Sequence, residues 1–203
     1  MNKNAIKNFA VSARIMLIQA VTQKAFEYEI TENGKNAPSQ AAVNGQSLTS
    51  AEQSQRAQLI AQIQAKGFAS TMEEAAYTWF NRFIALRFME VNNYLPSHTR
   101  IFSDEDGNFK PEVLTDAVNL DIDGLDKELV LELLEQQKNE QLYQYIFITQ
   151  CNALNEGLPE MFERIGGWTE LLFPKNLLRE DSVIAHMVKD IPESDWNDQV
   201  QII

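Results

Sequence analysis

The stretch TMEEAAYTWFNRFIALRFMEVNNY, residues 71–94, decides the fold of this chain. Thr71 followed three residues later by Glu74 has the pattern of a capping box, so a helix of about six turns is expected to begin here. At the helical period its large apolar side chains cover most of the circumference, and they include Trp79, Phe83, Leu86 and Phe88. The stretch therefore predicts an all-α protein, a multi-helix bundle around one long buried central helix.

Two charged residues, Arg87 and Glu90, fall on the same arc as these apolar side chains and should be at least partly buried. A buried charge has to be paired or functional. Because a separation of three residues on a helix permits contact, a structural ion pair is one interpretation. A binding role for Arg87, with Arg82 on the flank of the helix, is the other.

Length and composition indicate an ordinary globular protein. The 203 residues suffice for one well-filled core or at most two small ones. An apolar fraction of 44% with 23% charged residues argues against wholesale disorder. No run of eighteen apolar residues and no leader pattern occurs, so we expect a cytoplasmic protein without a membrane partner.

Cysteine and histidine usage gives no indication of a metal centre. Cys151 is the single cysteine, and the two histidines, His98 and His186, lie too far apart in sequence for a zinc set. Cys151 falls in an expected helix with no histidine nearby, which favours a buried packing thiol over a nucleophile.

An acidic segment, NLDIDG at residues 119–124, resembles the start of an EF-hand loop. The twelfth place of that loop is Val130 instead of glutamate, and the eighth is Asp126 where an apolar residue belongs. A capped acidic turn is therefore expected in place of a calcium site.

The formal charge of −12 is unevenly spread. Residues 1–100 carry ten Lys or Arg against seven Asp or Glu, whereas residues 101–203 carry seven against twenty-two. Only the first half could face phosphates. An expected helix over residues 4–29 places four basic side chains within a sector of roughly 100°, namely Lys3, Lys7, Arg14 and Lys24. This basic stripe is either a solvated face or a surface that follows phosphates.

The remaining elements follow from local signals. Residues 31–48 are rich in Asn, Gly and Ser and are expected to form a mobile loop. Thr49 and Glu52 form a second capping box, and Gly67 should end the helix that begins there. Residues 100–111, with Asp106-Gly107 at the turn, predict a short β-hairpin.

The acidic second half should contain several shorter helices. One is expected to open at Pro111 and to run through Ala117. Residues 126–155 predict two helices separated near residues 138–140, and shorter helices are expected at residues 160–164 and 182–188. Residues 168–173 are expected to pack before Pro174. The apolar end at residues 200–203 suggests a chain cut from something longer.

Three strings carry a resemblance to a known family: YTWFNRFIALRFMEVNNY (residues 77–94), IFITQCNALNEGLPEMFE (146–163) and WTELLFPKNLL (168–178). In this order they resemble the N-terminal region of BREX-type adenine-specific DNA methyltransferases, the PglX family of phage-defence proteins. Residues 31–50 are the least family-like part. The resemblance implies that residues 1–203 are a helical N-terminal domain and that a methyltransferase domain using S-adenosylmethionine follows residue 203.

The chemistry of such an enzyme has no counterpart in this chain. A methyltransferase needs a glycine-rich turn for its cofactor and an Asn/Asp-Pro-Pro-Tyr/Phe loop for the extruded adenine. No Pro-Pro pair occurs, and Gly166-Gly167 follows no strand pattern. No catalytic, cofactor-binding or metal-binding residues are therefore assigned, and the fragment alone is expected to be inert.

Two functions of different classes remain open. In the first, the domain packs against the methyltransferase domain of the same chain and forms a wall of the channel for double-stranded DNA, with the basic stripe and Arg82 towards the phosphates. In the second, it is a docking module whose acidic half recruits other components of the defence complex. A DNA-mimicking role for the acidic half is a third and weaker interpretation.

Overall fold

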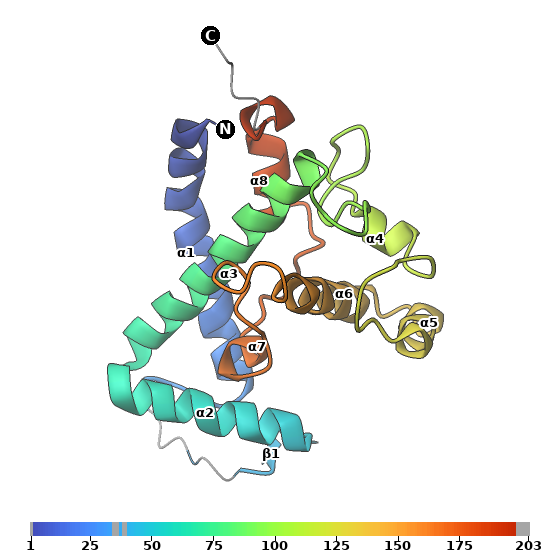
Figure 1. Cartoon of the computed structure of the whole chain (residues 1–203). Helices are drawn as coiled ribbons and strands as arrows, with labels where there is room; N and C mark the ends of the chain where they lie inside the picture. Colours follow the sequence, from blue (N-terminus) through green and yellow to red (C-terminus); the bar gives the residue numbers. More distant parts are fainter. Residues whose placement is uncertain (1, 34–36, 38–39, 198–203) are drawn as a thin grey trace. The chain divides into compact units, whose positions relative to one another are not determined.

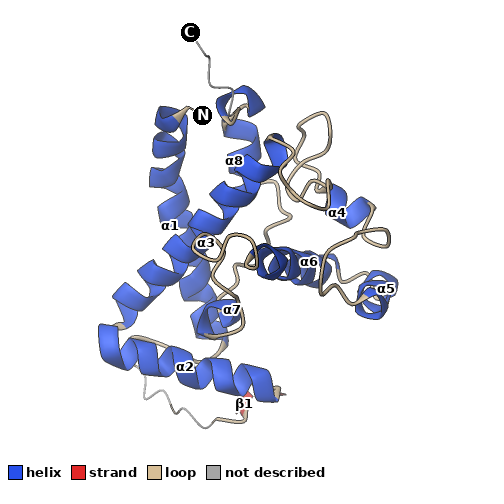
Figure 2. Cartoon of the chain, viewed as in Figure 1, coloured by secondary structure: helices blue, strands red, loops and turns tan. Residues whose placement is uncertain are grey.

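The computed structural model describes residues 2–33, 37 and 40–197, and it confirms the predicted all-helical fold (Figure 2). Two compact units can be distinguished. Unit 1 comprises Met1–Ala13, Asn81–Arg164 and Asn176–Ile203, and unit 2 comprises Arg14–Phe80 and Ile165–Lys175. Two of their four boundaries fall inside the long helices α1 (Lys3–Glu27) and α3 (Phe68–Val91).

In unit 2, α2 (Ser50–Lys66) begins and ends at the predicted residues and packs against α7 (Trp168–Leu171) (Figure 1). The Thr49 hydroxyl accepts from the Glu52 N–H, and the Glu52 carboxylate accepts from the Thr49 N–H, so both bonds of the capping box are present. Gly67 ends the helix with a φ of 85°, a conformation that favours glycine because a side chain would be strained there.

The capping box predicted at Thr71 and Glu74 is wrong, because α3 already begins at Phe68, directly after the break at Gly67. Thr71 therefore lies inside the helix, where its hydroxyl donates to the Gly67 carbonyl at 2.8 Å. Glu74 pairs with Lys66, with Nζ and Oε2 2.7 Å apart. The pattern of residues that caps a helix occurs here one turn past its start.

The hairpin of the fold lies in the segment expected to be a mobile loop. Strands β1 (Ala42–Val43) and β2 (Gln46–Ser47) pair antiparallel, and Asn44 and Gly45 both have positive φ, as a type I′ turn requires. Val43 and Leu48 are buried. Residues 34–36 and 38–39 of the predicted loop lie outside the described residues, as does the apolar end at residues 200–203.

The hairpin predicted at residues 100–111 does not form. The backbone N–H groups of Ile101 and Phe102 donate to the carboxylate of Glu90, at 2.5 and 2.7 Å, so they are not available for a strand ladder. The turn signal instead closes a loop in which Asp104 accepts from the Asn108 N–H at 2.8 Å.

Unit 1 contains the remaining helices. They are α4 (Glu112–Thr115), α5 (Lys127–Glu135), α6 (Asn139–Leu154), α8 (Val183–Asp190) and the 3₁₀ helix η1 (Glu193–Asp195). Both α4 and α5 pack against α6. The helix predicted at residues 160–164 is wrong, since residues 160–162 form a turn and a bend and residues 163–164 have no regular structure. The Asn155 side-chain amide donates to the Phe162 carbonyl.

Two aromatic side chains of α3, those of Trp79 and Phe83, lie in the cores as predicted. In unit 2, Trp79 meets Phe173 edge to face with ring centroids 4.9 Å apart. In unit 1, Phe83 makes the same kind of contact with Phe147 at 5.4 Å. Neither Trp79 nor Phe83 is more than 2% exposed. Within the described part of the chain, no helix is both long and apolar enough to cross a lipid bilayer.

Candidate functional site

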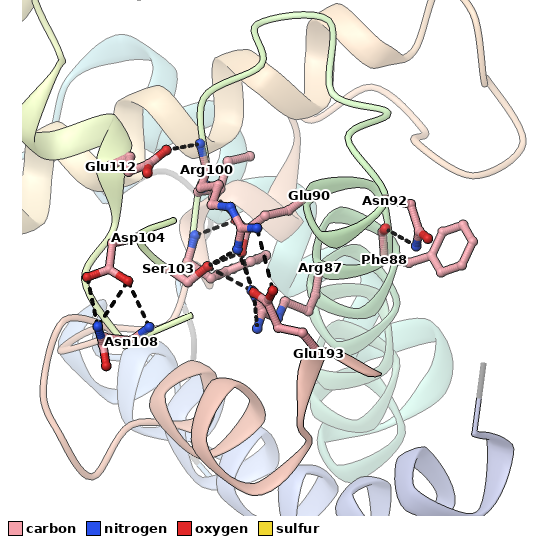
Figure 3. Close-up of polar contacts among 12 residues, drawn as sticks. Arg87, Phe88, Glu90, Asn92, Arg100, Ser103, Asp104, Asn108, Glu112 and Glu193 are labelled. Carbon is pink, nitrogen blue, oxygen red and sulfur yellow. Dashed lines mark hydrogen bonds and ion pairs between the residues drawn. The ribbon is translucent and has the colours of Figure 1, made fainter. Parts of the chain in front are cut away.

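Arg87 and Glu90, on the last turns of α3 in unit 1, are the centre of a buried polar cluster (Figure 3). Arg87 Nη1 donates to Glu90 Oε1. It also donates to Ser103 Oγ, and these two atoms are 2.9 Å apart. The Ser103 hydroxyl in turn donates to Glu90 Oε1 at 2.9 Å. Both charged side chains are fully shielded from solvent, so each depends on these partners.

Glu90 also holds the loop that follows α3. Its second oxygen accepts from two consecutive backbone N–H groups, those of Ile101 and Phe102. Burial raises the pKa of the Glu90 carboxyl, while the charge of Arg87 and these hydrogen bonds act in the opposite direction. The carboxylate thus replaces a strand partner for this part of the backbone.

Arg100, from the loop after α3, and Glu193, from a distant part of the sequence, complete the cluster (Figure 3). Glu193 Oε1 accepts from Arg87 Nη2 at 3.2 Å and from Arg100 Nη1 at 2.5 Å. Arg100 Nη1 also lies 3.0 Å from Ser103 Oγ. Burial alone would lower the pKa of Arg100, but its hydrogen bonds and charge attraction with Glu193 outweigh burial and raise it. Two arginines and two glutamates leave the cluster neutral.

A pocket of ≈ 220 Å³ adjoins the cluster in unit 1. It is lined by Glu90, Val91, Asn93, Leu95, His98, Thr99, Arg100, Glu105 and Glu112. Asn93 and His98 both have positive φ, and the Asn93 amide oxygen lies 3.1 Å from His98 Nδ1. With three glutamates against Arg100, the lining carries a negative balance.

The pocket does not fit S-adenosylmethionine. Pockets for drug-sized ligands span about 300–1,000 Å³, and this one is smaller. Its lining also contains no glycine, whereas such a cofactor needs a glycine-lined turn for close backbone approach. In the described ranges, no three His, Cys, Asp or Glu side chains are grouped so that they could hold a metal ion.

The sequence pointed to Arg87 and Glu90 but gave no signal for the other members of the cluster. Ser103, Arg100 and Glu193 stand in a loop and in a one-turn 3₁₀ helix, where no periodicity indicates a buried side. The one available clue was chemical, since two buried charges need further hydrogen-bond partners. It does not say which residues supply them.

The four side chains of the basic stripe differ in their surroundings along α1. Lys3 and Lys7 are exposed, and within the described residues neither takes part in an ion pair. Arg14 is also exposed, but it pairs with Glu73. The Lys24 side chain is only 14% exposed and pairs with Glu27 at 3.3 Å. Burial lowers the pKa of Lys24, while Glu27 opposes that effect.

The remaining candidates lie inside unit 1. Arg82 is 5% exposed, and its Nη2 donates to the carbonyl oxygen of Glu163 at 2.8 Å. Cys151 is fully buried in α6, and this burial raises the pKa of its thiol to about 12. Asp126, which stands at the eighth place of the EF-hand-like segment, is the N-cap of α5 and accepts from the Glu128 N–H at 2.9 Å.

Comparison with known proteins gives two curated relatives, while no protein-family model matches the chain. Over 233 aligned residues the chain is 35% identical to the adenine-specific methyltransferase PglX of Lacticaseibacillus casei (strain Zhang). Over 216 it is 34% identical to the adenine-specific methyltransferase BrxX of Escherichia coli O9:H4 (strain HS). Each alignment covers 100% of this chain but only 19% and 18% of the relatives, so the chain spans less than a fifth of their length.

Proposed function

Because the chain is homologous over its whole length to one part of the PglX and BrxX adenine-specific methyltransferases, we propose that it is the N-terminal helical domain of a BREX-type DNA N6-adenine methyltransferase. The parent enzyme takes the methyl group from S-adenosylmethionine, bound outside these 203 residues, and marks host DNA for phage defence. The homology along the entire chain is the observation that carries this proposal.

Within that enzyme the domain has an architectural role. The aromatic side chains of Trp79 and Phe83 are buried in the cores of the two units, and Arg87 and Glu90 pair with each other in the buried cluster. Such a domain can pack against the methyltransferase domain of the same chain and shape one wall of the channel for double-stranded DNA.

Contact with the DNA phosphates is assigned to the first part of the basic stripe. Lys3 and Lys7 are exposed and one helical turn apart on α1, so both ammonium groups can reach the same stretch of backbone. Arg14 can join them only by giving up Glu73. Lys24 and Arg82 are too deeply buried to contact a phosphate without a rearrangement.

The test is binding of a labelled DNA duplex to the full chain, measured by fluorescence anisotropy over a range of salt concentrations. Lys3→Glu/Lys7→Glu should weaken binding and reduce the slope of log K against log salt by about 1 for each lysine. Lys110→Glu/Lys138→Glu, which changes the same charge at two other exposed positions, should weaken it much less. Equal losses for the two pairs would contradict a specific role for the stripe.

A docking module for other components of the defence complex is the second candidate, and the surface of α5 favours it. Glu128, Glu132 and Glu135 are exposed there, and none of them pairs with a described basic side chain. A partner with a basic surface would complement them. Two results together would favour this function over the first. The chain would not bind DNA at low salt, and it would form a stable complex with another defence component that is lost in Glu128→Lys/Glu132→Lys.

A further inference from the structure

Two guanidinium groups in unit 1 converge on a single carboxylate oxygen. Glu193 Oε1 lies 3.2 Å from Arg87 Nη2 and 2.5 Å from Arg100 Nη1. Ser103 Oγ lies between the same two side chains, 2.9 Å from Arg87 Nη1 and 3.0 Å from Arg100 Nη1. The N–H groups of both arginines therefore point towards one small region, which Glu193 fills.

The charge balance of this region depends on Glu193. Without its carboxylate, the two guanidinium groups would keep a single hydrogen-bonded carboxylate among the described residues, that of Glu90, because Glu112 accepts from the backbone N–H of Arg100 and not from its side chain. Arg87 cannot turn to solvent, because its side chain is fully buried, and its Nε has no hydrogen-bond partner within the described structure. The N–H donors that Glu193 satisfies on both arginines would therefore need another acceptor.

Glu193 is the member of the cluster that solvent reaches most easily. Its side chain is 33% exposed, against 20% for Arg100 and none for Arg87 and Glu90. It belongs to the three-residue helix η1, and Gly107 packs close to its carboxyl group. Arg87 and Glu90, in contrast, are fixed on the long helix α3.

We propose that Arg87, Arg100 and Ser103 form a phosphate-binding site, and that the Glu193 carboxylate occupies it in this structure as an internal substitute. Guanidinium groups bind carboxylate and phosphate oxygens with the same paired N–H geometry, and Arg is the preferred residue where both are recognised. A phosphate group that displaces Glu193 would keep the N–H donors of both arginines satisfied. This site is separate from Lys3 and Lys7 and goes beyond the function proposed above.

A carboxylate carried by the chain itself competes strongly, because tethering gives it a high local concentration. The unmodified protein should therefore bind free phosphate weakly. Removing the competing carboxylate should expose the site, which makes Glu193 the position to change.

The experiment is titration of the full chain with inorganic phosphate, followed by calorimetry and by thermal unfolding, against chloride at equal ionic strength. Glu193→Ala is expected to bind phosphate at least tenfold more tightly than the unmodified chain. Glu193→Gln keeps the size of the side chain and covers the case in which the alanine variant folds poorly. Glu180→Ala is the matched control, because it removes a carboxylate from an exposed ion pair with Lys189 and should bind phosphate as the unmodified chain does.

Arg100→Met added to Glu193→Ala should abolish the gain. If the Glu193 variants fold but bind phosphate no better than the control, or if the gain survives Arg100→Met, the proposal is overturned. A short DNA duplex in place of inorganic phosphate identifies the source: a gain with both ligands indicates a backbone phosphodiester, and a gain with inorganic phosphate alone indicates a free phosphate. If Lys3→Glu/Lys7→Glu did not change DNA binding, the proposed DNA contact would be contradicted, but the phosphate affinity of Glu193→Ala would be unaffected. The two proposals can therefore be tested independently.

Discussion

Glu193 Oε1 lies 3.2 Å from Arg87 Nη2, although 106 residues separate the two in the sequence. This contact joins the one-turn helix η1 to the end of α3 within unit 1. The same segment is held at a second point, since the Asn92 side-chain amide donates to the Trp196 carbonyl at 3.0 Å. The end of the described chain is thus attached to the end of the long helix through polar contacts, and the Trp196 side chain is itself buried.

Arg87→Met should strongly destabilise the protein. It leaves the buried Glu90 carboxylate without its charged partner, and breaking a buried pair in this way typically costs about 3–5 kcal/mol. The free energy of unfolding from urea denaturation measures the effect. Arg179→Met, which removes an exposed pair with Asp181, is the control and should be close to neutral. A loss for Arg87→Met no larger than that of the control would show that the cluster does not stabilise the fold.

Arg56→Met should loosen the segment that follows α1 in unit 2. The fully buried Arg56 side chain donates to the carbonyl oxygens of Tyr28 and Ala37 and to the side-chain amide oxygen of Gln40. Without the guanidinium these three acceptors lose their donor, so Tyr28, Ala37 and Gln40 are held less firmly to α2. Limited proteolysis should then cut within this segment several-fold faster than in the unmodified chain. Unchanged cleavage rates there would contradict this role for Arg56.

Glu52→Gln should lower the free energy of unfolding at neutral pH. The variant should also lose less stability than the unmodified chain when the pH falls. Partial burial would raise the pKa of Glu52, but hydrogen bonds from Thr49 and Tyr28 lower it below the usual value. A carboxyl whose pKa is lower in the folded state stabilises the protein above its unfolded-state pKa, and this contribution is lost as the pH falls through the folded-state pKa.

The measurement for Glu52→Gln is urea unfolding between pH 7 and pH 3. The difference in the free energy of unfolding between the unmodified chain and the variant should become smaller as the pH falls. Thr49→Ala, which removes the other half of the capping box, should cost about 0.5–2 kcal/mol at pH 7. A gap that stays constant over the pH range would contradict the lowered pKa.

The thiol of Cys151 should be inert in the folded protein. Burial raises its pKa to about 12, so the reactive thiolate is scarce at pH 8, and reagents cannot reach the side chain. A thiol reagent at pH 8 should label the chain only as fast as it unfolds, and one thiol per chain should react in denaturant. Rapid labelling of the folded chain would show that α6 is open to solvent at this point.

Local signals in the sequence identified most helices correctly. Thr49 and Glu52 cap the first turn of α2, and Gly67 ends its last turn, as their sequence patterns predict. The same pattern gave a wrong prediction at Thr71 and Glu74. A Thr and a Glu three residues apart have the same sequence pattern inside a helix as at its N-terminus, and here the helix already begins after Gly67. The dominant apolar character of residues 71–94 predicted the buried helix regardless of that boundary.

Two turn signals show what local reading cannot decide. Asn44-Gly45 forms a hairpin, whereas Asp106-Gly107 does not. The difference is the Glu90 carboxylate, which takes the backbone N–H groups of Ile101 and Phe102. The partners of Arg87 could not be predicted from the sequence either, because Ser103 and Glu193 come close to it only in the folded protein.

The most direct test of the proposed function is adenine methylation of a DNA duplex by an intact methyltransferase that contains this chain. Lys3→Glu/Lys7→Glu should raise the KM for DNA several-fold and leave kcat nearly unchanged, because phosphate contacts of this kind bind the substrate and the transition state equally. Lys110→Glu/Lys138→Glu should leave both constants close to those of the unmodified enzyme. Unchanged KM and kcat in the Lys3 and Lys7 variant would contradict the assignment of this domain to the wall of the DNA channel.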